Sequence, residues 1–99
     1  GRELSRDIDG AIEAYRKAIA EDPSSRELRV QLGRAYLRAG RSDQAARTAR
    51  ALLDEDPAFV PALVLLGDTR RYENDADGAI EAYRAVVRHD PDRTDAWFR

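Results

Sequence analysis

Arginine dominates the side chains of this 99-residue chain that could do chemistry. Among its 17 basic residues, 16 are arginine and only Lys17 is lysine. The planar guanidinium group presents a fork of donors that matches a carboxylate. Arg34 and Arg38 are four residues apart, so they share one face of a helix. The pair is a candidate site for an acidic ligand. The alternatives are that these arginines are simply solvated, and that genome base composition produces the excess of arginine.

Two stretches contain the aspartate spacing that begins a calcium-binding loop, namely Asp7–Gly10 and Asp75–Gly78. Such a loop requires a bidentate glutamate six residues after its glycine. Those positions hold Arg16 and Arg84. Capping of the helices that follow explains the aspartates better. We therefore expect no metal site and no cofactor.

Catalysis and nucleic-acid binding have little support in the sequence. His89 is the only histidine, and it falls in the last turn of a predicted helix, without the partners that a dyad or a metal site needs. Tyr15 and Tyr83 could stack on bases, but their spacing is typical of core positions. The net charge of −2 lacks the basic excess typical of non-specific nucleic-acid binding. We expect neither an enzyme nor a nucleic-acid partner.

Composition indicates one small helical domain. Apolar residues make up 42% of the chain and charged residues 36%, while aromatic residues make up only 7%. The absence of cysteine excludes disulfides and leaves the redox compartment open. No apolar run approaches the roughly 20 residues of a membrane span, and no secretory signal is visible. The compartment stays open, with a soluble, cytoplasmic protein slightly favoured.

Apolar residues recur at steps of three and four and predict a series of helices. The first spans 8–21 and starts at an Asp7 N-cap, so that residues 1–6 would end an earlier helix. Ser24 with Glu27 has capping-box spacing and starts the next helix, which Gly40 closes. Further helices follow at about 42–55, from Pro61 to the closing Asn74, and at 76–89. The last of these is predicted to turn the following residues inward: Ala79, Ile80, Tyr83, Val86 and Val87.

A period of 34 residues organises the chain. Pro23, Pro57 and Pro91 are 34 apart, and Gly33 is matched by Gly67. Residues 7–23 and 75–91, two periods apart, share 11 of 17 identities. A short fixed period predicts stacked repeats, in which each unit buries its apolar face on its neighbours.

A 34-residue helical hairpin with this pattern resembles the tetratricopeptide repeat (TPR) family over essentially the whole chain. One unit matches at Leu32, Gly33, Tyr36, Ala45 and Pro57, and the next at Leu66, Gly67, Ala79, Tyr83 and Pro91. Ala11, Tyr15, Ala18 and Pro23 match the second half of a preceding unit. The chain departs from the pattern where Arg29 replaces an aromatic residue, where Arg70 replaces the equivalent of Tyr36, and where Ala49 replaces a large residue, which predicts looser local packing.

The resemblance implies an all-α, right-handed superhelical solenoid of antiparallel helix-turn-helix hairpins. It divides the single domain 1–99 into a partial repeat at 1–25, full repeats at 26–59 and 60–93, and the start of another at 94–99. We expect a part of a longer repeat array. Gly33 and Gly67 would let the paired helices approach near Ala45 and Ala79, with tyrosine and leucine side chains filling the space between them.

The family's first helices line a concave groove that holds peptides, which implies a non-enzymatic interaction module or scaffold. Its phasing places these residues on the groove: Glu27, Val30, Arg34, Leu37, Arg38, Val64, Asp68, Arg71 and Tyr72. With Arg71, the pair Arg34 and Arg38 could clamp an acidic segment or a C-terminal carboxylate. The lysine and asparagine clamp that some members use for chaperone tails is absent.

A structural role is the alternative function. Asp92 would cap a last segment that carries Trp97 and Phe98. If these two aromatic residues form an exposed edge, chains could stack end to end into homo-oligomers, and the module would be a self-assembling spacer.

Overall fold

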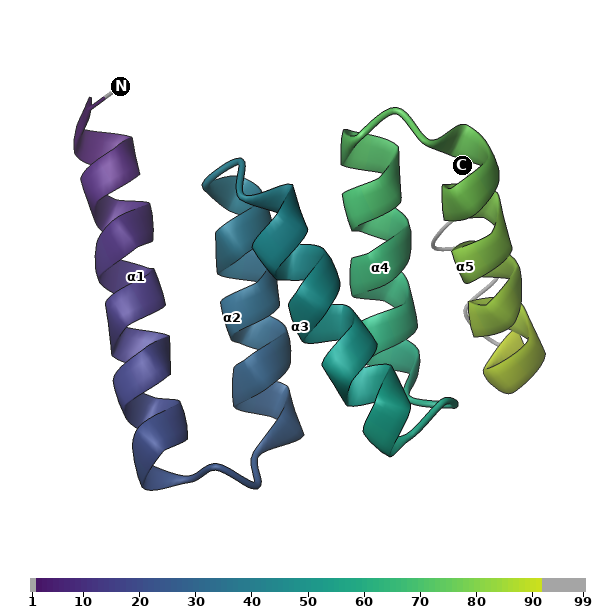
Figure 1. Cartoon of the computed structure of the whole chain (residues 1–99), viewed down its shortest axis with the longest axis horizontal. Helices are drawn as coiled ribbons and strands as arrows, with labels where there is room; N and C mark the ends of the chain where they lie inside the picture. The colour runs from purple at the N-terminus through teal and green to yellow at the C-terminus, as the bar shows by residue number, and fades with distance from the viewer. Residues whose placement is uncertain (1, 92–99) are drawn as a thin grey trace.

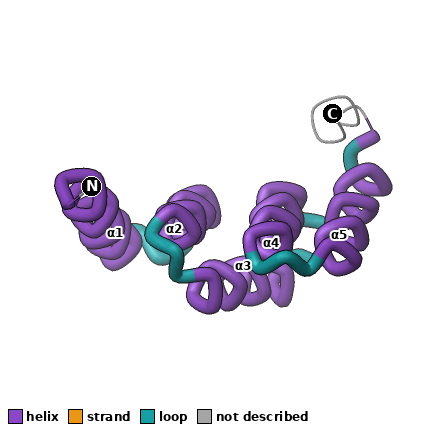
Figure 2. Tube along the Cα trace, turned by 90° about the horizontal axis from the view of Figure 1, so that it is seen from above, coloured by secondary structure: helices purple, strands orange, loops and turns teal. Residues whose placement is uncertain are grey.

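The computed structural model describes residues 2–91, with side chains from residue 7, and within them the chain forms five α-helices and no strand. The helices are α1 (Arg2–Glu21), α2 (Arg26–Arg38), α3 (Ser42–Glu55), α4 (Val60–Tyr72) and α5 (Ala76–His89). Figure 1 shows them side by side in chain order, each antiparallel to the one before it. In Figure 2, α2 and α4 lie on one side of the row and α3 on the other. The fold is the all-α helical repeat that the sequence predicts.

The turns between paired helices follow the predicted chemistry. Gly40 and Asn74 both have positive φ angles, 77° and 63°, at the equivalent point after α2 and α4. Glycine adopts this left-handed conformation readily, and asparagine is among the few other residues that tolerate it. The Asp75 side chain then accepts a hydrogen bond from the Gly78 amide at 3.0 Å and caps α5. The predicted bounds of α3 and α5 are confirmed, and Pro61 lies in the first turn of α4.

Two helix starts differ from the prediction. α1 begins at Arg2 and passes through Asp7, so Asp7 is not an N-cap. The position equivalent to Gly40 and Asn74 is Arg6, which does not favour the left-handed turn that would break the helix. The cap of α2 is Ser25, whose hydroxyl accepts from the Leu28 amide at 3.2 Å. The neighbouring Ser24 hydroxyl instead donates to Asp22 at 3.0 Å.

The two hairpin glycines are covered by different side chains. A Cβ on Gly67 would lie 2.6 Å from Cε1 of Tyr83, which packs directly on it from α5. The equivalent Gly33 lies against the side chain of Leu65, which comes from α4, and its hypothetical Cβ would be 3.3 Å from Thr48. Tyrosine and leucine do fill the space, as predicted, but the leucine is supplied by the following hairpin.

The departure at Ala49 does not loosen the packing as expected. Ala49 is fully buried in a cluster with Leu65 and Leu66, and Leu65 is 1% exposed. Ala49 stands where Tyr83 stands one repeat later. Because alanine is small, Leu65 occupies the room that the tyrosine ring takes in the next hairpin. The core is therefore continuous from one hairpin to the next.

One predicted core residue is on the surface. Ile80 of α5 is 45% exposed. Its equivalents one and two repeats earlier, Ala46 and Ile12, are both buried. Ile12 clusters with Ala35 and Tyr36 of α2, the first helix of the hairpin that follows it. In α1 this position is thus buried by the hairpin that follows. The residues that follow α5, 92–99, lie outside the described chain.

Candidate functional site

The hollow between α1 and α2, which we call the α1–α2 hollow, is the candidate site. It has a volume of about 530 Å³. From α1 it is lined by Asp7, Ile8, Ala11 and Tyr15, and from α2 by Gln31, Arg34, Ala35 and Arg38. The floor is therefore largely apolar, and the two arginines stand on the α2 wall. Such an arrangement can bury apolar groups of a ligand while its carboxylates pair with arginine.

The amphipathic pattern of α2 explains how the arginines reach this wall. Glu27, Arg34 and Arg38 are exposed, and Gln31 is half-buried, along one side of the helix. Gly33 and Tyr36 are buried on another side. Because helical residues three and four apart are neighbours on the surface, the exposed side chains form one stripe.

Arg34 and Arg38 are available to a ligand. Neither forms an ion pair with a carboxylate of the described residues. Both side chains are solvent-exposed. Arg34 also lines a smaller hollow of about 290 Å³, together with Glu27, Val30, Gln31, Phe59 and Pro61. Arg34 thus stands between two neighbouring hollows.

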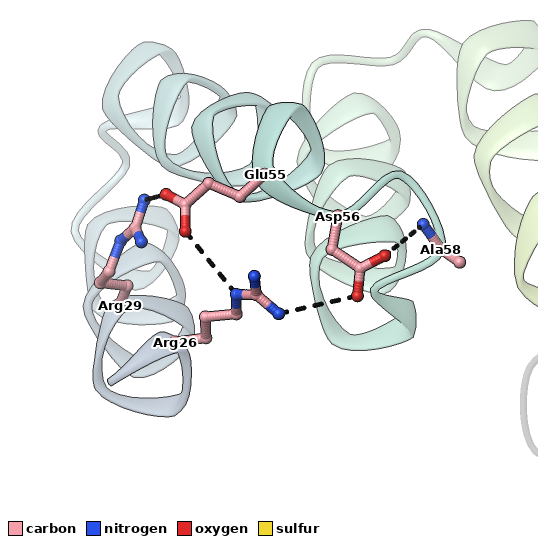
Figure 3. A network of polar contacts seen from close by, with 5 residues as sticks. All are labelled: Arg26, Arg29, Glu55, Asp56 and Ala58. Carbon is pink, nitrogen blue, oxygen red and sulfur yellow. Dashed lines mark hydrogen bonds and ion pairs between the residues drawn. The ribbon is translucent and has the colours of Figure 1, made fainter. Parts of the chain in front are cut away.

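A second set of arginines has structural partners (Figure 3). Arg29 Nη2 lies 2.7 Å from Glu55 Oε2, and Arg26 lies 3.6 Å from Glu55 and 3.7 Å from Asp56. Asp56 also accepts from the Ala58 amide at 3.1 Å. Arg29, which replaces an aromatic residue, therefore joins α2 to the end of α3. Its hydrogen bond is the main cause that lowers the pKa of Glu55 below the ordinary value of 4.5.

The other arginine that departs from the TPR pattern, Arg70, also has a structural partner. Its Nη1 donates to the carbonyl oxygen of Gly78 at 3.1 Å and so links α4 to the first turn of α5. Arg41 likewise lies 3.5 Å from Asp9 and links the start of α3 to α1. These contacts distinguish Arg70 and Arg41 from the arginines of the α1–α2 hollow.

The apolar residues predicted for the groove are in the core or against it. Val30 is 4% exposed and packs with Leu52 and Ala62. Val64 is 1% exposed and packs with Leu63 and Val86. Both valines are therefore largely buried by neighbouring helices, although Val30 also lines the smaller hollow, and their part in a partner-binding groove stays a prediction. Leu37 is half-buried against the cluster of Ile12, Ala35, Tyr36 and Ala45.

The predicted groove residues of α4 lie apart from both hollows. The Asp68 carboxylate accepts a hydrogen bond from the Tyr83 hydroxyl at 2.5 Å. Burial and this hydrogen bond raise the pKa of Tyr83 to about 12. Arg71 is exposed, and Tyr72 is 56% exposed near the Gly40 turn. The structure therefore places Arg34 beside Arg38 in the α1–α2 hollow and beside Glu27 in the smaller one, while a common site with Arg71 stays a prediction.

The sequence did not predict the α1 side of the hollow. Tyr15 packs against the core cluster of Ile12, as its spacing predicts, but it is only half-buried and also lines the hollow, as Ala11 does. Their equivalents Ala79 and Tyr83 are indeed buried, because α4 packs on α5. Within residues 2–91, no helix packs on α1 as α4 packs on α5. Comparing Ala11 and Tyr15 with their equivalents in α5 could have indicated the lining of the hollow, but only once it is known which helices pack on α1 and on α5.

Trp97 and Phe98 lie outside the described residues, so end-to-end stacking stays a prediction. Among residues 7–91, no three acidic or histidine side chains gather in a group that could hold a metal ion. Of the described helices, none combines the length and the apolar character needed to cross a membrane.

Comparison with known protein families agrees with the fold of repeated helical hairpins. Two family models, both described as tetratricopeptide repeat, match residues 4–68 and 64–99. The chain belongs to the tetratricopeptide repeat family. TPR repeats form a non-enzymatic family that mediates protein–protein interaction.

Curated TPR relatives include proteins of very different length. The BBSome complex member BBS4 of Bos taurus is 34% identical over 84 residues, which are 85% of this chain and 16% of the relative. The TPR repeat-containing protein PA0015 of Pseudomonas aeruginosa is 33% identical over 72 residues, 73% of this chain and 69% of the relative. Tetratricopeptide repeat protein 21A of Mus musculus is 28% identical over 87 residues, 88% of this chain and 7% of the relative. The chain therefore spans only a small part of BBS4 and of protein 21A.

Proposed function

We propose that this TPR chain is a protein-binding module that holds an acidic segment of a partner protein in the α1–α2 hollow. Arg34 and Arg38 bind carboxylates of that segment, and Ile8, Ala11 and Tyr15 contact its apolar side chains. Arg71, exposed on α4, extends the basic surface along the array.

One observation carries the proposal: an apolar floor lies beside two exposed arginines that have no ion pair in the described chain. Arginines that act within the fold, such as Arg29, are paired with carboxylates of neighbouring helices. A floor without charges would bind apolar groups with little selectivity, and exposed charges alone would bind weakly. The two together favour a ligand that is both apolar and acidic.

The relatives support a role in assembly. BBS4 is by its printed name a member of a complex, and family membership makes interaction with proteins the expected activity. We propose the same kind of role here, in which the chain connects its partner to a larger assembly.

Affinity capture tests the proposal. The immobilised chain is exposed to a lysate of the organism that encodes it, beside the double variant R34E/R38E and the matched control R47E/R50E. Arg47 and Arg50 are exposed on α3, away from the α1–α2 hollow, and have no ion pair in the described chain. All three proteins are first compared by circular dichroism.

We expect one partner to be captured by the parent chain and by the control, and lost with R34E/R38E. Purified partner should then bind the R34E/R38E variant at least tenfold more weakly, which corresponds to about 1.4 kcal/mol. Equal capture by all three proteins would show that the two arginines do not bind the partner. The variant that adds Arg71→Glu tests whether α4 contributes to the same contact.

A further inference from the structure

The smaller hollow lies between the first helices of two successive hairpins, α2 and α4. Its volume is about 290 Å³, and it is lined by Glu27, Val30, Gln31, Arg34, Phe59 and Pro61. Within the described chain, α1 precedes these helices, α5 follows them, and α3 packs against both. The walls of the smaller hollow are therefore formed by consecutive elements inside the array and not by either end of it.

The floor of the smaller hollow is apolar and held in place. Val30 belongs to a buried core cluster, and Phe59 packs half-buried against that cluster. The Arg26 guanidinium carbon lies 5.8 Å from the centre of the Phe59 ring. The same guanidinium group is paired with the carboxylates of Glu55 and Asp56 at the end of α3. The Phe59 ring is therefore a fixed wall, which favours a large apolar side chain of a ligand, and an aromatic one above all.

Three polar side chains of α2 form the rim of the smaller hollow. Glu27, Gln31 and Arg34 are three or four residues apart, so they lie along one side of the helix. None of these side chains forms a hydrogen bond or an ion pair within the described chain. The rim thus has a negative end and, two turns or about 10 Å further along the helix axis, a positive end. The amide between them can both donate to and accept from a peptide group.

We propose that the smaller hollow binds an extended segment of a partner protein in which a basic, a large apolar and an acidic residue occupy every second position. Every second side chain of an extended segment points to the same side, and the outer two are about 13 Å apart, which long side chains reconcile with the rim. The basic residue pairs with Glu27, the apolar one packs on Phe59, and the acidic one pairs with Arg34. The inference rests on the proposed function, because it names further residues of the acidic segment that Arg34 binds.

The probe is a short peptide, capped at both ends, in which lysine, phenylalanine and glutamate alternate with alanine. It is titrated into the ¹⁵N-labelled 99-residue chain, and amide shifts are followed by NMR. We expect saturable shifts along α2 from Glu27 to Arg34 and around Phe59. Shifts centred on another surface, or no saturable shift at millimolar concentration, would overturn the assignment to the smaller hollow.

Two altered peptides test the apolar contact. Replacing the phenylalanine of the peptide by alanine should lower its affinity at least tenfold, because the large apolar side chain supplies most of the buried surface. A peptide of unchanged composition, with the phenylalanine moved by one position, presents its ring to the opposite side of the extended chain and should lose as much. Unchanged affinity of the first peptide would show that no side chain fills the hollow, and unchanged affinity of the second would refute the alternating arrangement.

Charge reversal in the protein tests the rim. The parent chain should prefer the lysine peptide over one with glutamate in place of that lysine, and Glu27→Lys should reverse the preference. Each effect should be about twofold to fivefold, because the pair is exposed. The control is Glu13→Lys, an exposed position of α1 that lines neither hollow and makes the same change in net charge. An equal effect of both variants would show that net charge, and not Glu27, selects the peptide.

The two proposals fail in different ways. If no peptide binds while capture from the lysate still depends on Arg34 and Arg38, the smaller hollow does not bind such a segment and the binding module stands. If the peptide binds with the expected dependence on its phenylalanine and on Glu27 while capture ignores the two arginines, the smaller hollow stands as a site and the role proposed for the α1–α2 hollow is wrong.

Discussion

The same substitution should have opposite effects on stability at two glycines. Gly10 and Gly67 both lie inside helices, α1 and α4. A Cβ on Gly10 would have no atom within 4 Å, whereas one on Gly67 would lie 2.6 Å from the Tyr83 ring. We expect Gly10→Ala to stabilise the fold and Gly67→Ala to destabilise it. The comparison separates helix propensity from packing.

The magnitudes follow from these contacts. At Gly10 only backbone entropy and propensity change, and alanine gains roughly 0.5–1 kcal/mol. At Gly67 the same gain is opposed by overpacking, which costs typically about 1–3 kcal/mol. The ring of Tyr83 is itself held by Asp68, so its displacement also strains a hydrogen bond. The net loss at Gly67 should therefore be up to about 2.5 kcal/mol.

Urea and thermal unfolding, followed by circular dichroism at 222 nm, measure both effects. In a chain of this size, about 1 kcal/mol moves the midpoint of thermal unfolding by roughly 4–8 °C. Gly67→Ala is repeated in a Tyr83→Ala background, where no ring remains to be displaced and the substitution should become neutral or stabilising. If Gly67→Ala stabilises the otherwise unchanged chain as much as Gly10→Ala does, close packing on Tyr83 is not the reason for this glycine.

Three further outcomes follow from the packing and the titrating groups. Leu65→Ala should cost about 2–5 kcal/mol in urea unfolding, because a fully buried side chain leaves a cavity between two hairpins. The hydrogen bond from Arg29 lowers the pKa of Glu55, so its stabilisation is present above about pH 4.5 and is lost as the pH falls through the lowered pKa. Unfolding measured from pH 6 to 2 should show a smaller loss of stability for Glu55→Gln. The pKa of Tyr83 is raised to about 12 by burial and the bond from its hydroxyl to Asp68, so its contribution is full below pH 10 and is lost as the pH rises towards 12. In an ultraviolet titration, Tyr83→Phe should remove the ionisation step near pH 12.

Much of the fold was predictable because its signals are local. Gly40 and Asn74 mark the turns by backbone conformation, and Asp75 marks a helix start by its capping side chain. The 34-residue period then fixes the order of packing, since each hairpin must bury its face on the next. The predicted start of α1 at Asp7 is wrong because a capping side chain does not end the preceding helix by itself, and Arg6 does not favour the left-handed turn that would do so.

The candidate site was less predictable because it depends on contacts between helices. Val30 and Val64 lie at positions that the repeat pattern assigns to the groove, yet neighbouring helices bury both side chains. The position of a residue around its helix does not specify how closely the neighbouring helices approach it. The pairing of Arg29 with Glu55 joins residues 26 positions apart in sequence. No local pattern distinguishes such an arginine from Arg34, which has no partner within the described chain.

The two glycine contacts show why equivalent positions in this array are not interchangeable. Gly67 is filled from within its own hairpin by Tyr83, whereas Gly33 is filled from the following hairpin by Leu65. The first arrangement can form as soon as α4 meets α5, but the second requires α4 to be in place beside α2 and α3. Small Ala49 therefore makes the hairpin of α2 and α3 depend on its neighbour, and the repeats are stabilised as one stack.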